Sequence, residues 1–204
     1  MRPLRAFAIA VLVAAEFGCA SVARSQPANV SALGLKLGTH TLDDVVARLG
    51  NAERVYTGDA STAETSVCYQ AGHGEVIVFA SNDEMGGRNL ELTDIRLHVV
   101  GQGDRDCLKL VRDSPISLSN GLRLGLTKAQ VRSTIGVCLA IGAHGRCVKV
   151  PFRKGTPGYK RWAGAKGCYR DGEAPYYSVC TTVAAKFEGD KAVWIQVTRI
   201  ESVC

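Results

Sequence analysis

The stretch GLKLG at residues 34–38 returns later in the chain as GLRLG at residues 121–125. Each copy is followed by a threonine, Thr41 or Thr127, just before a segment in which apolar residues recur with helical spacing. Threonine is a favoured helix N-cap because its side-chain oxygen accepts a hydrogen bond from an amide of the first turn. Self-similarity of this kind predicts two tandem copies of one structural unit.

The two predicted helices share further start and stop signals. Asp44 and Gln130 stand three residues beyond the caps, where each side chain can accept a hydrogen bond from the amide of its cap. Gly50 and Gly136 stand where a helix commonly ends with a positive φ. Each helix carries a narrow apolar stripe, formed by Leu42, Val45, Val46 and Leu49 in the first copy and by Val131 and Ile135 in the second.

Both helices are followed by strand patterns, in which apolar and polar residues alternate. The predicted strands cover residues 75–81, 90–100, 178–187 and 192–200. The fold class predicted from this order is α+β: two tandem repeats, at residues 30–107 and 116–204, each with short N-terminal helices packed on an antiparallel sheet.

Seven cysteines follow residue 24, which is typical of a chain that folds in an oxidising compartment. The repeat predicts a bridge between Cys68 and Cys107, because each has a counterpart at a similar position in the second copy, Cys168 and Cys204. Cys138 and Cys147 are close enough in sequence for a local bridge. Cys168, Cys180 and Cys204 then compete for one more, and we expect Cys180 to be the spare thiol.

A glycine, a threonine-capped helix with valine at its fourth position, a closing glycine and antiparallel strands form a pattern that resembles the SmpA/OmlA type of outer-membrane assembly lipoprotein. Val45 and Val131 occupy that fourth position. Two such units in tandem are similar to the β-lactamase inhibitor protein architecture. The resemblance covers both halves of the chain, and it implies that the strands together form one concave sheet with the helices behind it.

The beginning of the sequence resembles a secretory signal. Arg2 and Arg5 precede an uncharged apolar run at residues 6–15 that is too short to cross a bilayer. We expect residues 1–23 to be removed and the protein to be periplasmic or secreted. Lipid attachment at Cys19 is the alternative, and it would make the protein an outer-membrane lipoprotein.

Charge is distributed unevenly along the chain. The net charge is +6, and residues 114–170 contain eleven basic residues and neither Asp nor Glu. The second copy carries an insertion at residues 149–170 that interleaves charges with aromatic rings and has no counterpart in the first copy. Arginine and aromatic side chains frequently anchor interfaces. The predicted binding residues are Arg153, Lys154, Tyr159, Lys160, Arg161, Trp162, Lys166, Tyr169 and Arg170. The alternative is a solvated basic loop whose aromatic rings pack on their own domain.

No residue pattern points to catalysis. His40, His73, His98 and His144 stand in unrelated settings, so we name no catalytic residue and expect a protein that is not an enzyme. Cys138, His144 and Cys147 lack the spacing of a zinc motif, and we expect neither a metal nor a cofactor.

The sequence therefore predicts an exported envelope protein-binding module, of partner or inhibitor type, that acts through a concave sheet and a basic aromatic rim. The expected partner is an acidic envelope protein or an exported enzyme. Anionic lipid or lipopolysaccharide and a second copy of the chain are alternatives; nucleic acid would suit the charge, but export argues against it. The second hypothesis is an outer-membrane-associated assembly or cell-wall factor, anchored through Cys19, and an unrecognised hydrolase is the third.

Overall fold

The computed structural model describes residues 29–59, 62–82, 88–101, 104, 106–112, 114–135, 146–151 and 176–202. The predicted signal segment and Cys19 lie outside this part of the chain. Two α-helices are described, α1 (Leu42–Leu49) and α2 (Lys128–Ile135), with two short 3₁₀ turns, η1 (Gly72–Gly74) and η3 (Arg88–Leu90). The strands are β1 (Ser31–Ala32), β2 (Leu35–Lys36), β3 (Arg54–Thr57), β4 (Glu64–Gln70), β5 (Glu75–Asn82), β6 (Asp94–Val99), β7 (Leu108–Lys109), β8 (Arg146–Pro151), β9 (Tyr176–Glu188) and β10 (Lys191–Ser202).

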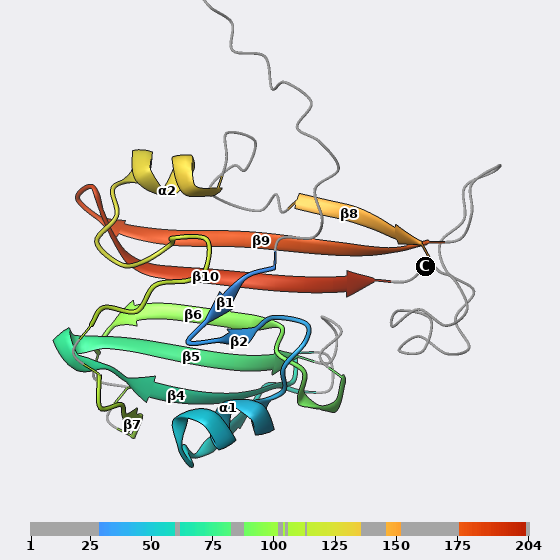
Figure 1. Cartoon of the computed structure of the whole chain (residues 1–204), viewed down its shortest axis with the longest axis horizontal. Helices are drawn as coiled ribbons and strands as arrows, with labels where there is room; N and C mark the ends of the chain where they lie inside the picture. The colour runs from blue at the N-terminus through green and yellow to red at the C-terminus, as the bar shows by residue number, and fades with distance from the viewer. Residues whose placement is uncertain are drawn as a thin grey trace, which may run out of the picture.

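The described strands form one large sheet and one small hairpin, so the fold is α+β, as the sequence predicts. The large sheet has the order β3-β4-β5-β6-β10-β9-β8, and β7 adds a short parallel pairing to β4. All other neighbours in the sheet are antiparallel. β6 and β10 lie side by side in the middle of the sheet, while α1 and the β1–β2 hairpin lie in front of it (Figure 1).

The helix caps have the predicted hydrogen bonds. In α1, the Asp44 amide donates to the Thr41 hydroxyl, and the Thr41 amide donates to the Asp44 carboxylate over 2.8 Å. In α2, the Gln130 amide donates to the Thr127 hydroxyl, and the Thr127 amide donates to the Gln130 side chain over 2.9 Å. Gly50 ends α1 with a φ of 109°, and its amide donates to the Val46 carbonyl. Gly136 lies outside the described residues.

One hydrophobic cluster joins both helices to the same face of the sheet. Leu42 and Val45 of α1 and Val131 of α2 are fully buried in it. Apolar side chains of neighbouring strands meet them in rows, because residues paired across antiparallel strands point to the same face. These residues are Val67, Tyr69, Ile77, Phe79, Ile95, Leu97, Val183, Ile195 and Val197. Because both helices pack on this face, the opposite face of the sheet points away from the helices.

The disulfides confirm one predicted pairing and correct another. Cys68 is bonded to Cys107, as predicted. Cys147 is bonded to Cys180, so both the local bridge from Cys138 to Cys147 and the role of Cys180 as the spare thiol are wrong. The reason is β8: Cys147 lies directly opposite Cys180 across the β8–β9 pairing, with a Cα–Cα distance of 4.0 Å. Cys138, Cys168 and Cys204 lie outside the described residues.

Candidate functional site

The face of the sheet opposite α1 and α2 carries polar side chains in register across several strands. One row runs from Ser66 through Ala80, Asp94 and Thr198 to Thr182, and the next runs from Cys68 through Val78, Arg96 and Gln196 to Ala184. A third contains Gln70, Val76, His98, Trp194 and Lys186. We call the surface formed by these three rows and Glu64 the polar face. Most of its side chains are half-buried, whereas those on the core face are fully buried.

An ion-pair network occupies the centre of the polar face. Arg96 Nε lies 2.7 Å from Asp94 Oδ1, and the same guanidinium pairs with the carboxylate of Glu64. Asp94 Oδ2 accepts two further hydrogen bonds, from Gln196 Nε2 and Thr198 Oγ1, each over 2.6 Å. The network links β4, β6 and β10, and it spans β5, the strand between β4 and β6, which contributes the apolar Val78 and Ala80 to the same two rows.

The network places charges where water is scarce. The Asp94 side chain is 3% exposed, and the Arg96 side chain is 25% exposed. Burial raises the pKa of Asp94, although Arg96, Gln196 and Thr198 all favour its ionised form. Burial alone would lower the pKa of Arg96, but Glu64 and Asp94 outweigh it and raise that pKa. Arg96 is therefore a permanently charged group held in one position.

Further polar and aromatic groups lie beside this network. The Lys186 ammonium lies 5.1 Å from the centre of the Trp194 ring, a cation–π arrangement. His98 Nδ1 lies 3.5 Å from a carboxylate oxygen of Asp104, which belongs to the segment after β6. Arginine, tryptophan and paired charges held by their neighbours form a surface with fixed hydrogen-bonding directions. Such an arrangement suits recognition of another molecule.

The predicted binding residues of the insertion, Arg153 to Arg170, lie outside the described residues, but the ends of the insertion are described. Pro151 of β8 pairs with Tyr176 of β9, so the chain leaves and re-enters the sheet at one point on its edge. Just before that point, the Lys149 ammonium lies 4.4 Å from the centre of the Tyr176 ring. The insertion therefore connects two adjacent strands at the β8 edge.

The histidines take separate structural positions where they are described. His40 Nδ1 accepts a hydrogen bond from the Lys36 amide over 3.0 Å, which fixes the turn before α1. His73 lies in η1 with a φ of 62°. The described residues contain no group of three His, Cys, Asp or Glu side chains that could hold a metal ion.

Sequence reasoning missed the network of Glu64, Asp94 and Arg96. One signal was present, because Asp94 and Arg96 alternate with Ile95 and Leu97 in a strand. Alternation of charges with apolar residues places the charges together on one face. The partner Glu64 is distant in the sequence, and only the pairing of β4, β5 and β6 brings it near.

None of the protein-family models matches the chain, and no curated protein or solved structure matches it significantly. In the part of the chain that the structure describes, neither α-helix is long and apolar enough to cross a membrane.

Proposed function

We propose that the protein is an exported envelope protein-binding module whose polar face, with the basic aromatic insertion at its edge, binds an acidic partner or inhibits an exported enzyme. The observation that carries this proposal is the buried ion-pair network in the middle of the polar face. A charged network held in place before binding loses little conformational entropy when a partner docks. Glu64 and Asp94 neutralise Arg96, so the positive charge that would complement an acidic surface comes from Lys186 and from the basic residues of the insertion.

We also propose that the fold arose as two tandem repeats, at residues 30–107 and 116–204. The turns before the two helices make equivalent backbone hydrogen bonds. The Gly38 amide donates to the Leu92 carbonyl, and the Gly125 amide donates to the Ala192 carbonyl. A second hydrogen bond runs in the opposite direction in each half: the Leu92 amide donates to the His40 carbonyl, and the Ala192 amide donates to the Leu126 carbonyl. Each helix start is thereby attached to the beginning of a strand in its own half.

A tandem origin is consistent with the resemblance to SmpA/OmlA-type units and to the β-lactamase inhibitor protein architecture. In that architecture the two copies share one concave sheet, and the concave side is our proposed docking surface. The two disulfides support an oxidising compartment, which together with the signal-like beginning of the sequence favours the periplasm or secretion.

The proposal is tested by capture of partners from an envelope extract at physiological salt. Ala184→Glu adds a negative charge beside Gln196 on the polar face, where Ala184 is half-buried, and replaces no member of the network. The matched control is Asn51→Glu, at an exposed position after α1. A third variant replaces Lys160, Arg161 and Trp162 by alanine.

We expect Ala184→Glu to lose the captured partner because its carboxylate repels an acidic surface, and we expect the triple variant to lose it as well. We expect Asn51→Glu to retain it. Identical captures by all four proteins would refute the proposal. Loss with the triple variant alone would restrict binding to the insertion and remove the polar face from the proposal.

A further inference from the structure

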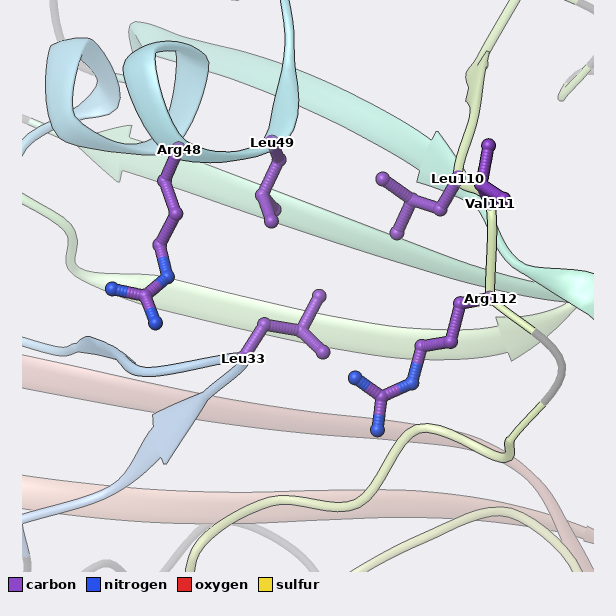
Figure 2. A pocket seen from close by; sticks show the side chains of 6 residues that line it. All are labelled: Leu33, Arg48, Leu49, Leu110, Val111 and Arg112. Carbon is purple, nitrogen blue, oxygen red and sulfur yellow. The ribbon is translucent and has the colours of Figure 1, made fainter.

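A second surface lies on the helix side of the molecule, away from the polar face. It is a groove of about 470 Å³, which falls within the range of about 300–1,000 Å³ typical of small-molecule sites. Its walls are formed by Leu33, Arg48, Leu49, Leu110, Val111 and Arg112. Figure 2 shows the side chains of Arg48 and Arg112 reaching into this space from opposite sides of Leu33.

The two arginines are available for a ligand. The described residues place no carboxylate within ion-pair distance of either guanidinium, and the wall of the groove contains none. Arg112 uses only Nε, which donates to the Ser114 carbonyl over 3.2 Å, so its terminal nitrogens are left for another acceptor. Two guanidinium groups at one groove form a strong site for an anion, because each can donate two parallel hydrogen bonds to a carboxylate or phosphate.

The position of Arg48 depends on a glycine. A Cβ added at Gly34 would lie 2.6 Å from Arg48 Nη2, so the guanidinium lies directly against this turn and would have to move if residue 34 carried a side chain. Gly34 has a φ of 81°, and Leu33 before it has a φ of 53°. A leucine rarely adopts a positive φ, because its Cβ crowds the backbone. The backbone of the hairpin is therefore locally strained at Leu33. In this conformation the Leu33 side chain lies between the two arginines (Figure 2).

The opposite wall exposes an apolar side chain on a fixed backbone. The Leu110 amide donates to the Gln70 carbonyl, and the Gly72 amide donates to the Arg112 carbonyl, which holds the segment on both sides. Between these anchors the Arg112 amide donates to the Leu110 carbonyl, and this tight turn projects Val111 fully into solvent. The fold gains no burial from a valine in that position, but on the same fixed segment the Leu110 side chain points into the groove toward Leu49 (Figure 2).

We infer that this groove binds a soluble anionic amphiphile, that is, a carboxylate or phosphate head on a single alkyl chain. Arg48 and Arg112 hold the head, and the chain lies along Leu33, Leu49 and Leu110. The inference is independent of the proposed protein-binding function, because it involves the opposite side of the sheet.

The test is calorimetric titration of the full-length, disulfide-intact protein with decyl phosphate and with decanoate, both below their micelle-forming concentrations. Decyl maltoside supplies the same chain without charge, and inorganic phosphate supplies the head without the chain. We expect one bound decyl phosphate per chain, with affinity for each of the two controls weaker by at least about tenfold, because both halves of the ligand contribute.

Three variants locate the ligand. Arg48→Gln and Arg112→Gln each remove one guanidinium, and each is expected to weaken decyl phosphate binding by about tenfold, the effect of losing a charged hydrogen-bonded contact. Arg54→Gln removes an equal charge on β3, outside the groove, and is expected to leave binding unchanged.

Equal binding of decyl maltoside, or wild-type affinity in both groove variants, would overturn the inference. A further arm uses vesicles that contain anionic phospholipid. Binding to these vesicles without binding to monomeric decyl phosphate would also overturn it, because the groove would then not accept a free amphiphile.

Discussion

Arg96 and Gln196 are direct cross-strand partners at the junction of β6 and β10. The residues on either side of this pair are also matched across the junction. Ile95 pairs with Val197, and Leu97 pairs with Ile195. As in any antiparallel pair, a local two-fold axis relates the two strands, and here one such axis passes through the pair of Arg96 and Gln196. Only one of these two paired positions carries a charge.

The unequal roles of these two residues predict unequal costs of replacement. Arg96→Leu leaves the carboxylates of Glu64 and Asp94 without their cation, and we expect the free energy of unfolding at pH 7 to fall by about 2–3 kcal/mol. Gln196→Leu removes one hydrogen bond to Asp94, which still interacts with Arg96 and Thr198. We expect it to lower the free energy of unfolding by about 1 kcal/mol. Urea denaturation of both variants measures the difference. Equal losses would contradict a central role for Arg96.

Asp94 predicts an unusual pH dependence. Burial raises the folded-state pKa of Asp94 above the unfolded value, so the folded chain holds this proton at pH values where the unfolded chain has released it. The resulting stability is fully present below the unfolded pKa and is lost as pH rises through the folded pKa. We therefore expect the wild-type protein to gain stability relative to Asp94→Asn as pH falls from about 7 to about 4, measured by urea denaturation at several pH values. An ordinary salt-bridged aspartate would give the opposite slope.

The two helix caps offer a matched comparison. Thr41→Ala and Thr127→Ala should each cost about 1 kcal/mol at pH 7, because each removes the same bond from a hydroxyl to a first-turn amide. Hydrogen bonds from Thr41, chiefly from its backbone amide, lower the pKa of Asp44 in the folded protein. The contribution of Asp44 to folding stability is therefore present above its unfolded pKa and is lost as pH falls through the lowered folded pKa.

Acid should therefore reduce the effect of Thr41→Ala, since protonation of Asp44 already weakens that cap. The effect of Thr127→Ala should be unchanged, because its partner Gln130 does not titrate. Denaturation of both variants at neutral and acidic pH measures this contrast. A parallel decrease in both variants would show that the acid effect arises elsewhere.

Local patterns could be predicted from the sequence, and pairings between distant segments could not. The caps at Thr41 and Thr127 depend on bonds within three residues, so the sequence alone contains the whole interaction. Cys147 is the clearest example: its partner Cys180 is 33 positions away, and the sequence pattern of residues 146–151 does not by itself predict the strand β8. Proximity in the sequence favoured Cys138 instead. Residues 146–151 are short and carry two basic side chains, so their strand character depends on pairing with β9.

The corrected disulfide leads to a mapping experiment. Proteolysis of the non-reduced protein followed by mass spectrometry should release one peptide pair that contains Cys147 and Cys180 and another that contains Cys68 and Cys107. Replacing either pair by serine should lower the free energy of unfolding by about 3 kcal/mol, because each bridge closes a loop of 33 or 39 positions in the unfolded chain. Recovery of a peptide pair linking Cys138 to Cys147 would refute the cross-strand bridge.

Substitutions of Leu33 distinguish its effect on the stability of the hairpin from its effect on ligand binding in the groove. Leu33 and Gly34 both have positive φ, which is the backbone of a type I′ turn, and Asn-Gly is the dipeptide that favours this turn most. Leu33→Asn should relieve about 1 kcal/mol of backbone strain while losing the contact of Leu33 with the core cluster. We therefore expect the free energy of unfolding to stay within about 1 kcal/mol of the wild-type value, whereas decyl phosphate binding should be lost.

Leu33→Val gives the converse result. It keeps an apolar wall for the alkyl chain, so we expect decyl phosphate binding to be retained, but a β-branched residue tolerates a positive φ poorly and stability should fall. Thermal denaturation and calorimetric titration of the two variants measure both properties. A loss of about 2–5 kcal/mol in Leu33→Asn, the range for truncation of a buried leucine, would mean that Leu33 anchors the core and that its positive φ is unrelated to ligand binding.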